Sequence, residues 1–380
     1  MTNSLHFTIF CKVVDNFGDI GICWRLARQL HSEHNASVSL WVDDLTSFQA
    51  IAPAIDCQQA RQLLAGVEVV HWPDELVEFE SDSNVIIESF ACELPKAVVG
   101  WMVRQTKKPV WINLEYLTAE SWIDGCHALA SLQPAQALQK FFFFPGFSSA
   151  SGGLLRERDL PGRRRSFQTG NQAPAFLQQW GIARQMDELL ISLFCYDYAK
   201  VEDLLNCLRE GENAVRCIVP AGKMVPAVCR FLELDQPDMR AIYRRGALSI
   251  QFIPFLNVQA YDELLWSCDL NFVRGEDSWI RAQWAAVPLI WQPYRQDDGA
   301  HLEKLDAFMQ RYCAQLPDEV AQCWQAISRA WSGDEPLQEV WRDFIRVIKP
   351  LRIHAAHWAD QLAQQPDLAS NLVNFCQSRL

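Results

Sequence analysis

The sequence lacks the features that would place the chain in a membrane or in an oxidising compartment. No stretch approaches the roughly 18 uninterrupted apolar residues of a membrane-spanning helix. Residues 1–10 form a strand pattern without the basic lead or the small-residue cleavage site of a secretory signal. The 13 cysteines include no Cys-x-x-Cys pair, which favours buried free thiols in a reducing compartment. We therefore expect a cytoplasmic protein without a membrane partner.

Basic charge is also scarce. The chain has 34 Lys and Arg against 46 Asp and Glu, and its net charge is −12. Nucleic-acid binding needs a basic face that neutralises phosphates, so we expect no nucleic-acid partner. An anionic ligand would then be held by a few well-placed arginines or by backbone N–H groups.

Signals for a bound metal or dinucleotide are weak. His354 and His357 lie about one helical turn apart and Asp360 follows a turn later, but nothing nearby supplies a fourth ligand. We interpret these residues as an ordinary helix surface. The glycines after the first predicted strand do not form the G-x-G-x-x-G fingerprint of a dinucleotide site. We therefore expect neither a metal nor a bound cofactor.

Strand and helix patterns alternate along the chain. A typical domain has about 150 residues, so a chain of 380 residues suggests two domains. The buried strands predicted in the first half are Phe7–Val14, Val38–Val42, Val67–His71, Val85–Glu88 and Val110–Asn113. Those predicted in the second half are Leu189–Phe194, Ala214–Val219, Leu248–Ile253, Leu270–Val273 and Pro288–Trp291. Such alternation is typical of mostly parallel sheets with helices on both faces.

The same reading sets provisional domain boundaries. We expect one α/β domain over residues 1–180 and a second over 181–354, with a helical tail of about 355–380 that crosses back to the first. Two Rossmann-like, doubly wound domains that face each other across a cleft, with such a tail, match the architecture called GT-B.

The segment Ser148–Gly170 is rich in Ser, Gly and Arg. We predict a long functional loop here, on the approach to the domain boundary. Its arginines form a candidate basic patch, although a solvated loop is the favoured interpretation: Arg156, Arg158, Arg163, Arg164 and Arg165.

A first candidate site follows the first strand. Asp15 and Asp19 stand at the carboxyl end of that strand, where open α/β sheets bind ligands. Gly18 and Gly21 allow the backbone to approach a bound group closely. The alternative is structural: Asp19 caps the following helix and Asp15 begins the turn.

A second candidate site is the strand-to-helix junction at Arg274. A helix N-terminus offers N–H groups and partial positive charge, which suit a diphosphate, and Arg274 adds a planar fork for phosphate oxygens. Gly275 allows the backbone to approach a bound ligand closely. Ser278 has a hydroxyl that can donate to the ligand, and Glu276 could accept hydrogen bonds from sugar hydroxyls. The alternative is a capping motif in which Asp277 or Ser278 is the cap and Arg274 pairs with Glu276.

Aromatic residues stand at the ends of the predicted strands in the second half. They are Phe194, Tyr196, Phe255 and Tyr294. If these strands are parallel, the rings face one crevice, where flat side chains can stack on a nucleobase. Aromatic residues are more often part of a core, so their shared position carries the argument.

Three segments together resemble one family. They are Asp15–Arg28 (DNFGDIGICWRLAR), Asn113–Glu120 (NLEYLTAE) and Asn271–Ser278 (NFVRGEDS). The chain resembles EarP, the family of bacterial protein-arginine rhamnosyltransferases that modify elongation factor P. The likeness continues through Gln283-Trp284 and Asp297–His301, so it covers most of the chain.

The resemblance implies an inverting GT-B glycosyltransferase, and Arg274 with the helix N-terminus after it could stabilise the leaving diphosphate without a metal. Such an enzyme moves L-rhamnose from dTDP-β-L-rhamnose to one arginine of elongation factor P, its protein partner, and so activates the factor for ribosomes stalled at polyproline. Residue by residue, Asp19 matches the general base, Asp15 the supporting aspartate and Glu276 a glutamate important for activity. The positions that match the donor site are Phe17, Gly18, Phe194, Tyr196, Phe255, Gln259, Arg274, Gly275, Glu276, Asp277, Ser278 and Tyr294.

Two other functions remain open from the residues alone. A nucleotide-sugar epimerase of the same architecture would act on the donor without a protein acceptor. A non-enzymatic module that binds a translation factor would keep its complex after loss of both aspartates. Neither function accounts for carboxylates and a diphosphate cradle at strand ends in opposite halves of the chain.

Overall fold

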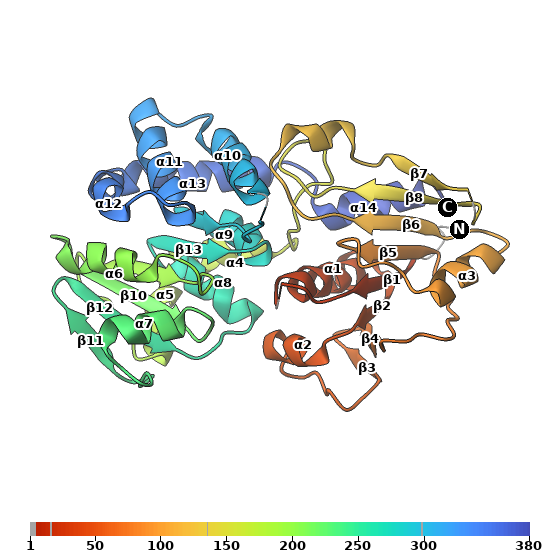
Figure 1. Ribbon diagram of the computed structural model, residues 1–380, viewed down its shortest axis with the longest axis horizontal. Coiled ribbons are helices and arrows are strands. Elements are labelled where there is room, and N and C mark those ends of the chain that lie inside the picture. Colours follow the sequence, from red (N-terminus) through yellow and green to blue (C-terminus); the bar gives the residue numbers. More distant parts are fainter. Residues whose placement is uncertain (1–4, 16, 135, 298) are drawn as a thin grey trace. The chain divides into compact units, whose positions relative to one another are not determined.

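The chain folds into two compact units. The computed structural model describes residues 5–15, 17–134, 136–297 and 299–380. The first unit comprises Met1–Arg158 together with Ala363–Leu380, and the second comprises Asp159–Leu362. Each unit is an α/β layer structure (Figure 1).

The first unit is built on a mostly parallel sheet. Among its described residues the sheet has eight strands, in the order β3-β4-β2-β1-β5-β6-β8-β7. The strands are β1 (His6–Cys11), β2 (Ser37–Val42), β3 (Arg61–Leu64), β4 (Val67–His71), β5 (Val85–Ser89), β6 (Val110–Leu114), β7 (Ala130–Gln133) and β8 (Leu138–Phe143). The edge pairs β3–β4 and β7–β8 are antiparallel and the inner pairs are parallel, which confirms the predicted sheet type.

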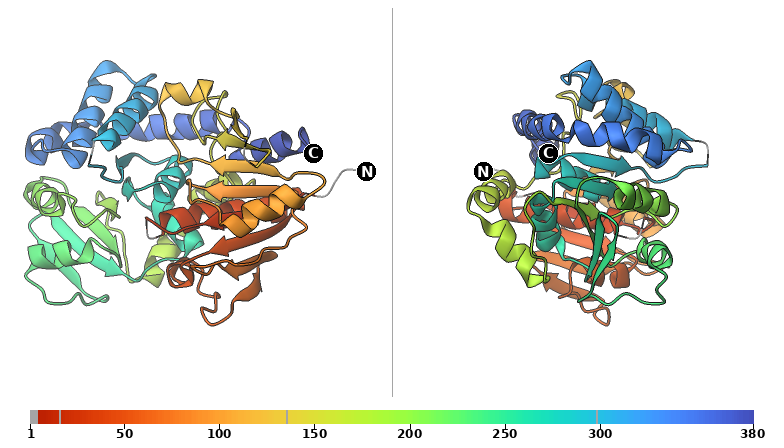
Figure 2. Two further views of the ribbon diagram at one scale, coloured as in Figure 1. Left: turned by 45° about the vertical axis from the view of Figure 1, so that its right-hand side comes forward. Right: turned by 90° about the vertical axis from the view of Figure 1, so that its left-hand side faces the viewer.

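Helices cover both faces of this sheet (Figure 2). The helices of the first unit are α1 (Gly18–His34), α2 (Leu45–Ile51), α3 (Lys96–Arg104), the short 3-10 helix η1 (Ser121–Gly125) and α14 (Leu368–Gln377). Phe10 packs in a hydrophobic cluster with side chains of α3, such as Trp101, whereas the neighbouring Cys11 interacts with Cys23 of α1. Successive strand side chains point to opposite faces, so α1 and α3 lie on opposite sides of the sheet.

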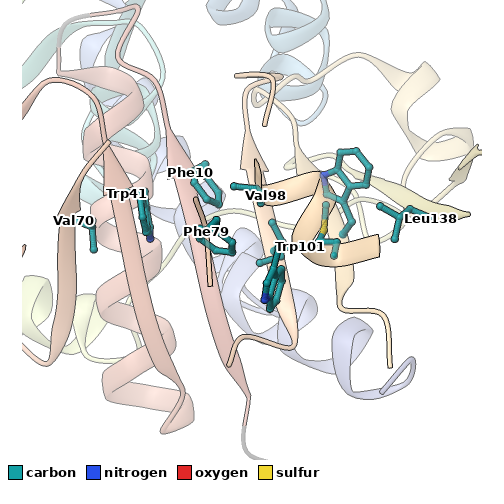
Figure 3. Close-up of a cluster of buried hydrophobic side chains, with 10 residues drawn as sticks. Phe10, Trp41, Val70, Phe79, Val98, Trp101 and Leu138 are labelled. Carbon is teal, nitrogen blue, oxygen red and sulfur yellow. The ribbon is translucent and has the colours of Figure 1, made fainter. Parts of the chain in front are cut away.

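The core on the α3 face is rich in aromatic residues (Figure 3). Phe10 packs against Trp41 and Phe79 at ring-centroid distances of 5.6 and 5.8 Å. Phe79 meets Trp101 of α3 edge to face at 5.2 Å. Burial of such large apolar side chains is the main stabilising contribution here, at roughly 25 cal/mol per Å² of apolar surface. This packing holds the carboxyl ends of β1 and β5 in place.

The C-terminal helix α14 belongs to the first unit and packs on α1. Asp367 caps α14 by accepting from the Ser370 N–H at 3.0 Å, and Gln29 of α1 donates to the same carboxylate at 3.0 Å. Phe375 packs edge to face on Phe141 of β8. The predicted tail therefore does return, beginning at Ala363 rather than near residue 355.

The second unit contains a similar sheet. Among its described residues the sheet has six strands, in the order β11-β12-β10-β9-β13-β14. They are β9 (Leu189–Leu193), β10 (Val215–Pro220), β11 (Ile242–Arg245), β12 (Leu248–Ile253), β13 (Leu270–Arg274) and β14 (Leu289–Gln292). Its helices are α4 (Leu160–Thr169), α5 (Gln172–Gln179), α6 (Val201–Glu210), α7 (Val225–Leu232), α8 (Val258–Ser267), α9 (Asp277–Ala285), α10 (Ala300–Cys313), α11 (Asp318–Ser332), α12 (Leu337–Arg346) and α13 (Ile348–Leu362).

The boundary between the units lies earlier than residue 180. The helices α4 and α5 pack on α8, and α4 also packs on α9, so both belong to the second unit. Arg164 of α4 is buried there and donates to the Trp284 carbonyl at 2.9 Å. The predicted long loop is therefore partly wrong, because its second part, Leu160–Thr169, is helix α4.

The arginines of the candidate basic patch divide between the two units, and four of them have partners among the described residues. Arg158 donates to the Glu33 carbonyl and Arg156 to that of Gln365, all within the first unit. In the second unit Arg163 pairs with Asp262 at 3.6 Å, and Arg164 is buried as described above. The favoured interpretation, a solvated loop, is right about solvent exposure for Arg158, Arg163 and Arg165 but not for the buried Arg164.

Residues proposed as a weak metal face have structural partners instead. His354 is buried edge to face against Tyr312 at 4.7 Å, so its assignment to a helix surface is wrong. Burial lowers the pKa of His354. Asp360 pairs with Arg164 at 3.7 Å. Within the described ranges no group of three or more His, Cys, Asp or Glu side chains could hold a metal.

All 13 cysteines are described, and all are free thiols. Most are buried, and none of the buried ones belongs to a metal-binding group. Within the same described ranges, no helix combines the length and apolar character that crossing a bilayer requires.

Candidate active site

Asp15 and Asp19 lie together at the carboxyl end of β1. The Gly18 N–H donates to the Asp15 carbonyl at 2.7 Å, which makes the turn into α1. A Cβ at Gly18 would lie 3.0 Å from Asp15 Oδ2, so glycine allows this close approach. Asn16 of the same loop is outside the described residues. The prediction that Asp15 begins a turn is confirmed.

Asp19 does not cap α1. The N-cap is Phe17, which makes no side-chain cap, and Asp19 Oδ2 instead accepts from the backbone N–H groups of Val14 and Asp15, each at 2.8 Å. Asp19 is 2% exposed. Its carboxylate thus ties the loop back to the helix start and stands beside a second carboxylate.

The environment of Asp19 raises its pKa. Burial is the largest cause, because it penalises the charged form, and the nearby Asp15 carboxylate acts in the same direction. Hydrogen bonds from the Asp15 and Val14 N–H groups and from the Tyr116 side chain act in the opposite direction. A buried carboxyl with a raised pKa at a strand end is well suited to accept a proton.

Tyr116 is a residue to which the sequence pattern assigned no role. It stands two residues beyond the end of β6, bonds to Asp19 and stacks on Phe90 at 4.4 Å with an interplanar angle of 16°. The quoted segment Asn113–Glu120 contains Tyr116, but its contact with Asp19 is a long-range one that no local pattern reveals.

Arg274 ends β13 and leads into α9 through a tight turn. Gly275 adopts a φ of +55°, a left-handed conformation that favours glycine, and its N–H donates to the Gln292 carbonyl at 3.1 Å. Glu276 is the N-cap of α9 and is half-buried, and no side-chain cap bond is present at this described helix start. The N–H groups of the first turn of a helix have no partners within the helix itself, so this end favours an anion.

Arg274 is buried without pairing to Glu276. Its guanidinium lies over the rings of Phe194 and Tyr196, 4.8 and 4.5 Å from their centroids. Arg274 is 6% exposed, and its Nη1 has no hydrogen-bond partner within the described ranges. A buried, unpartnered N–H on a permanently charged side chain is costly, which indicates a place for an anionic ligand. The capping alternative predicted that Arg274 pairs with Glu276, and that part of it is wrong.

Ser278 and Asp277 stabilise the turn between β13 and α9. The Ser278 hydroxyl donates to the Arg274 carbonyl and accepts from the Arg274 N–H at 3.0 Å, and its contact with a donor stays a prediction. Asp277 pairs with Arg281 at 2.8 Å, and Arg281 pairs with Asp262 of α8 at 3.1 Å. These contacts fix the position of α9 and, through it, of Arg274.

Three of the four predicted aromatics come together. Phe194 and Tyr196 follow β9, and Tyr294, which follows β14, meets Tyr196 edge to face at 5.7 Å. Tyr294 is 52% exposed. Phe255 follows β12, which is separated from β9 by β10 in the sheet. Gln259 is exposed on α8 and donates to Glu263 at 3.1 Å, so any contact with a donor remains a prediction.

Tyr198 extends this aromatic group and is a second residue that the sequence analysis missed. Its ring stacks on Tyr196 at 5.1 Å with an interplanar angle of 9°. Its hydroxyl donates to the Pro293 carbonyl at 3.4 Å and accepts from the Arg295 N–H at 2.9 Å. Tyr198 thus joins the segment after β9 to the segment after β14.

Comparisons with known proteins agree with this picture. A model of the family described as elongation-factor P (EF-P) rhamnosyltransferase EarP matches residues 7–377. The chain is 44% identical over 373 residues to a protein-arginine rhamnosyltransferase of Pseudomonas putida, covering 98% of each protein. It is 45% identical over 368 residues to the same enzyme of Pseudomonas aeruginosa, covering 97% of each.

Solved structures give the same answer for the fold. A structure that explains EarP-mediated arginine glycosylation of translation elongation factor EF-P matches with a TM-score of 0.70 and 33% identity over 99% of each chain. The glycosyltransferase VinC, solved with dTDP, matches at a TM-score of 0.52 and 11% identity, over 99% of this chain and 100% of VinC, which shows likeness of fold alone. The fold is therefore GT-B, and the chain is a glycosyltransferase that belongs to the EarP family of elongation-factor P rhamnosyltransferases.

Proposed function

We propose that this glycosyltransferase moves L-rhamnose from dTDP-β-L-rhamnose to an arginine guanidinium of elongation factor P, with inversion at the sugar carbon. The observation that carries the proposal is the buried Asp19 carboxylate, held beside Asp15 at the end of β1 in a chain of the EarP family. The names of the relatives support the sugar and the acceptor. The donor nucleotide rests on the resemblance and on the chemistry around Arg274.

A guanidinium is a difficult nucleophile. Its pKa is above 12 and that of a free aspartate is near 4, a gap of about 8 units. Complete proton transfer before the reaction would cost on the order of 11 kcal/mol, at about 1.36 kcal/mol per unit. Burial raises the pKa of Asp19 and narrows this gap. Even so, proton loss is expected to accompany bond formation rather than to precede it.

The transfer step replaces one bond to the anomeric carbon with another. One guanidinium nitrogen forms a bond to the anomeric carbon of rhamnose, while the bond from that carbon to the diphosphate oxygen breaks. The electron pair of the broken bond leaves on dTDP, and the proton lost by the nitrogen passes to Asp19. The rhamnosylated guanidinium keeps one positive charge. Asp15 holds the incoming cation and desolvates it together with Asp19.

The second unit supplies the site for the leaving group. Negative charge develops on the diphosphate as the glycosidic bond breaks, and fixed positive charge stabilises it in the transition state. Arg274 and the N-terminus of α9 offer that charge, since the guanidinium is buried and its Nη1 has no partner within the described part of the chain. Tyr196, Tyr198 and Tyr294 form a flat-sided group suited to a nucleobase. We propose that this reaction needs no metal.

Intact-mass measurement of elongation factor P tests the proposal. Purified factor is incubated with this protein and dTDP-β-L-rhamnose, and the expected result is a mass increase of one deoxyhexose that maps to an arginine. The Asp19→Asn variant is the negative control. An unchanged mass with fully folded wild-type protein would overturn the proposal. A mass increase with dTDP-glucose equal to that with dTDP-rhamnose would overturn the sugar assignment alone.

A further inference from the structure

Two stacked aromatic side chains lie at the ends of neighbouring parallel strands, and one of them, Tyr116, bonds to Asp19. Phe90 follows β5 and Tyr116 follows β6, and β5 lies between β1 and β6 in the sheet. The two rings stack at a centroid distance of 4.4 Å and an interplanar angle of 16°. Tyr116 is 38% exposed, so part of its ring remains accessible to a ligand.

The position of Tyr116 is well fixed by the backbone on either side of it. The Glu115 N–H donates to the Phe143 carbonyl at 3.0 Å, and Thr118 forms a bridge with Gly146. Asn113 donates from its side-chain amide to the Glu115 carboxylate. An exposed tyrosine between two such anchors is preorganised rather than mobile.

The backbone that carries Phe90 is strained. Phe90, Ala91 and Glu93 have φ values of +56°, +51° and +56°, a left-handed conformation that non-glycine residues rarely adopt. The Phe90 N–H donates to the Leu114 carbonyl at 2.7 Å, and Cys92 donates from its thiol to the Phe10 carbonyl at 3.5 Å. Strain of this kind persists where the surroundings enforce it, and it is common at ligand sites.

The acceptor in the proposed reaction is a flat cation, and flat cations bind aromatic faces. A guanidinium stacks on a tyrosine ring through cation–π attraction while its N–H groups donate in its own plane to carboxylates. The Tyr116 hydroxyl bonds to Asp19, so the ring lies within reach of any group that Asp19 binds.

We propose that Tyr116 acts on the acceptor arginine in two ways, resting on the proposed function. Its ring, supported by Phe90, is a platform for the guanidinium, and its hydroxyl orients the Asp19 carboxylate that receives the proton. The ring therefore contributes to acceptor binding, and the hydroxyl contributes to the acid–base step. These two contributions are separable by substitution.

The titratable groups around Asp19 decide how the hydroxyl is tested. Asp15 lies in the same loop, Cys11 at the end of β1 and Tyr116 beyond β6, with Cys23 of α1 and Cys92 of the β5–α3 segment close to Cys11. The hydrogen bond with Cys23 and burial raise the pKa of Cys11, and burial raises the pKa of Cys92 to about 12, so both thiols stay neutral. The acid limb of the rate profile then reports Asp19.

The sign of the effect follows from the hydrogen bond. Tyr116 donates to the charged form of Asp19 and so lowers its pKa. Tyr116→Phe removes that bond and keeps the ring. The pKa of Asp19 rises further, and the acid limb of kcat moves to higher pH. We expect kcat at neutral pH to fall between about threefold and tenfold, with the acceptor KM close to that of the wild type.

Tyr116→Leu removes the ring as well. The acceptor KM should then rise by about 2- to 30-fold beyond the effect of Tyr116→Phe, because a cation–π contact is lost. Phe90→Leu is a second variant for the platform, since it withdraws the support and leaves the Asp19 contact in place. Tyr243→Phe is the matched control, because it removes a hydroxyl that accepts from the Asp238 N–H at 2.9 Å on an edge strand of the second unit.

The experiment is a pH profile of rhamnosyl transfer to elongation factor P, with KM and kcat measured for all four variants and dTDP affinity as the check on folding. A wild type that transfers no sugar would overturn the proposed function itself. If the wild type is active, an unshifted acid limb in Tyr116→Phe would overturn the role of the hydroxyl. An acceptor KM unchanged in both Tyr116→Leu and Phe90→Leu would overturn the platform.

Discussion

The β1–α1 and β13–α9 junctions share one local design with opposite charge. In each, a buried parallel strand ends, a glycine allows a tight turn, and a helix begins without a side-chain cap among the described residues. At the first junction the helix start holds the carboxylate of the protein itself, Asp19, whose oxygen accepts two backbone N–H groups at 2.8 Å. At the second the strand ends in Arg274, buried with an unpartnered Nη1 within the described ranges.

This difference accounts for a division of the chemistry. Both helix starts favour negative charge, because the aligned peptide dipoles place partial positive charge there. One of them is occupied by an aspartate of the chain, which can then serve as a base. The other carries an arginine and, in our proposal, receives the diphosphate of the donor. In our proposal, the first junction acts on the acceptor and the second on the donor.

The largest expected effect is that of Asp19→Asn. Transfer should fall by about 10²- to 10⁴-fold, the usual contribution of a positioned general base. The asparagine oxygen still accepts from Val14 and Asp15, so the loop should keep its conformation. Transfer is measured by intact mass of the acceptor, and activity within threefold of the wild type would contradict the role of Asp19.

The same variant also makes a prediction about stability. The pKa of Asp19 is raised in the folded state, so its favourable contribution is present below the ordinary carboxyl pKa and is lost as the pH rises through the raised value. At neutral pH the charged Asp19 therefore destabilises the folded state, and Asp19→Asn should have a Tm equal to or above that of the wild type. A lower Tm at neutral pH would show that the charge itself stabilises the fold.

Arg274→Lys should have the next largest effect. It keeps the charge and loses the planar fork, so the donor KM should rise by about 10- to 100-fold while kcat at saturating donor changes less. Arg346→Lys is the control, because this exposed arginine pairs with the exposed Asp343 at 3.2 Å. An unchanged donor KM would remove Arg274 from the phosphate site.

Tyr198→Phe should have a smaller effect. The variant keeps the stack on Tyr196 and loses the hydroxyl contacts with Pro293 and Arg295. We expect dTDP affinity to fall by about two- to tenfold, because the segment that carries Tyr294 loses its anchor. Calorimetric titration measures this, and equal affinity in variant and wild type would restrict Tyr198 to a structural role.

A chelator should have no effect at all. Since Arg274 and the α9 N-terminus are proposed to stabilise the leaving diphosphate, transfer with excess EDTA should equal transfer without it. Loss of activity that returns on addition of magnesium would replace this part of the account with a metal-assisted reaction.

The sequence predicted the elements that carry both junctions because the strands are buried runs of apolar residues. Phe7–Val14 and Leu270–Val273 each stand at a strand, and the glycines after them mark the turns. The edge strands β3, β7 and β11 escaped prediction because each is four residues long and largely exposed. Edge strands lack the continuous run of apolar residues by which a central strand can be predicted from the sequence.

The contacts within the sites were less predictable. Asp15 and Asp19 are four residues apart, so a local motif was enough to bring them together. Tyr116 reaches Asp19 from β6, and Tyr198 joins two segments nearly a hundred residues apart in the chain. Such contacts depend on strand order, which alternating patterns leave open. The partners of Ser278 were missed for a different reason, since a hydroxyl can donate to a ligand or to its own backbone.

The most direct test of the division between the two junctions is calorimetric titration of dTDP into wild type, Asp19→Asn and Arg274→Lys side by side. The account predicts wild-type affinity for Asp19→Asn, although transfer by that variant should be strongly reduced, and clearly weakened affinity for Arg274→Lys. Equal loss of dTDP affinity in both variants would contradict it, because Asp19 would then belong to the donor site.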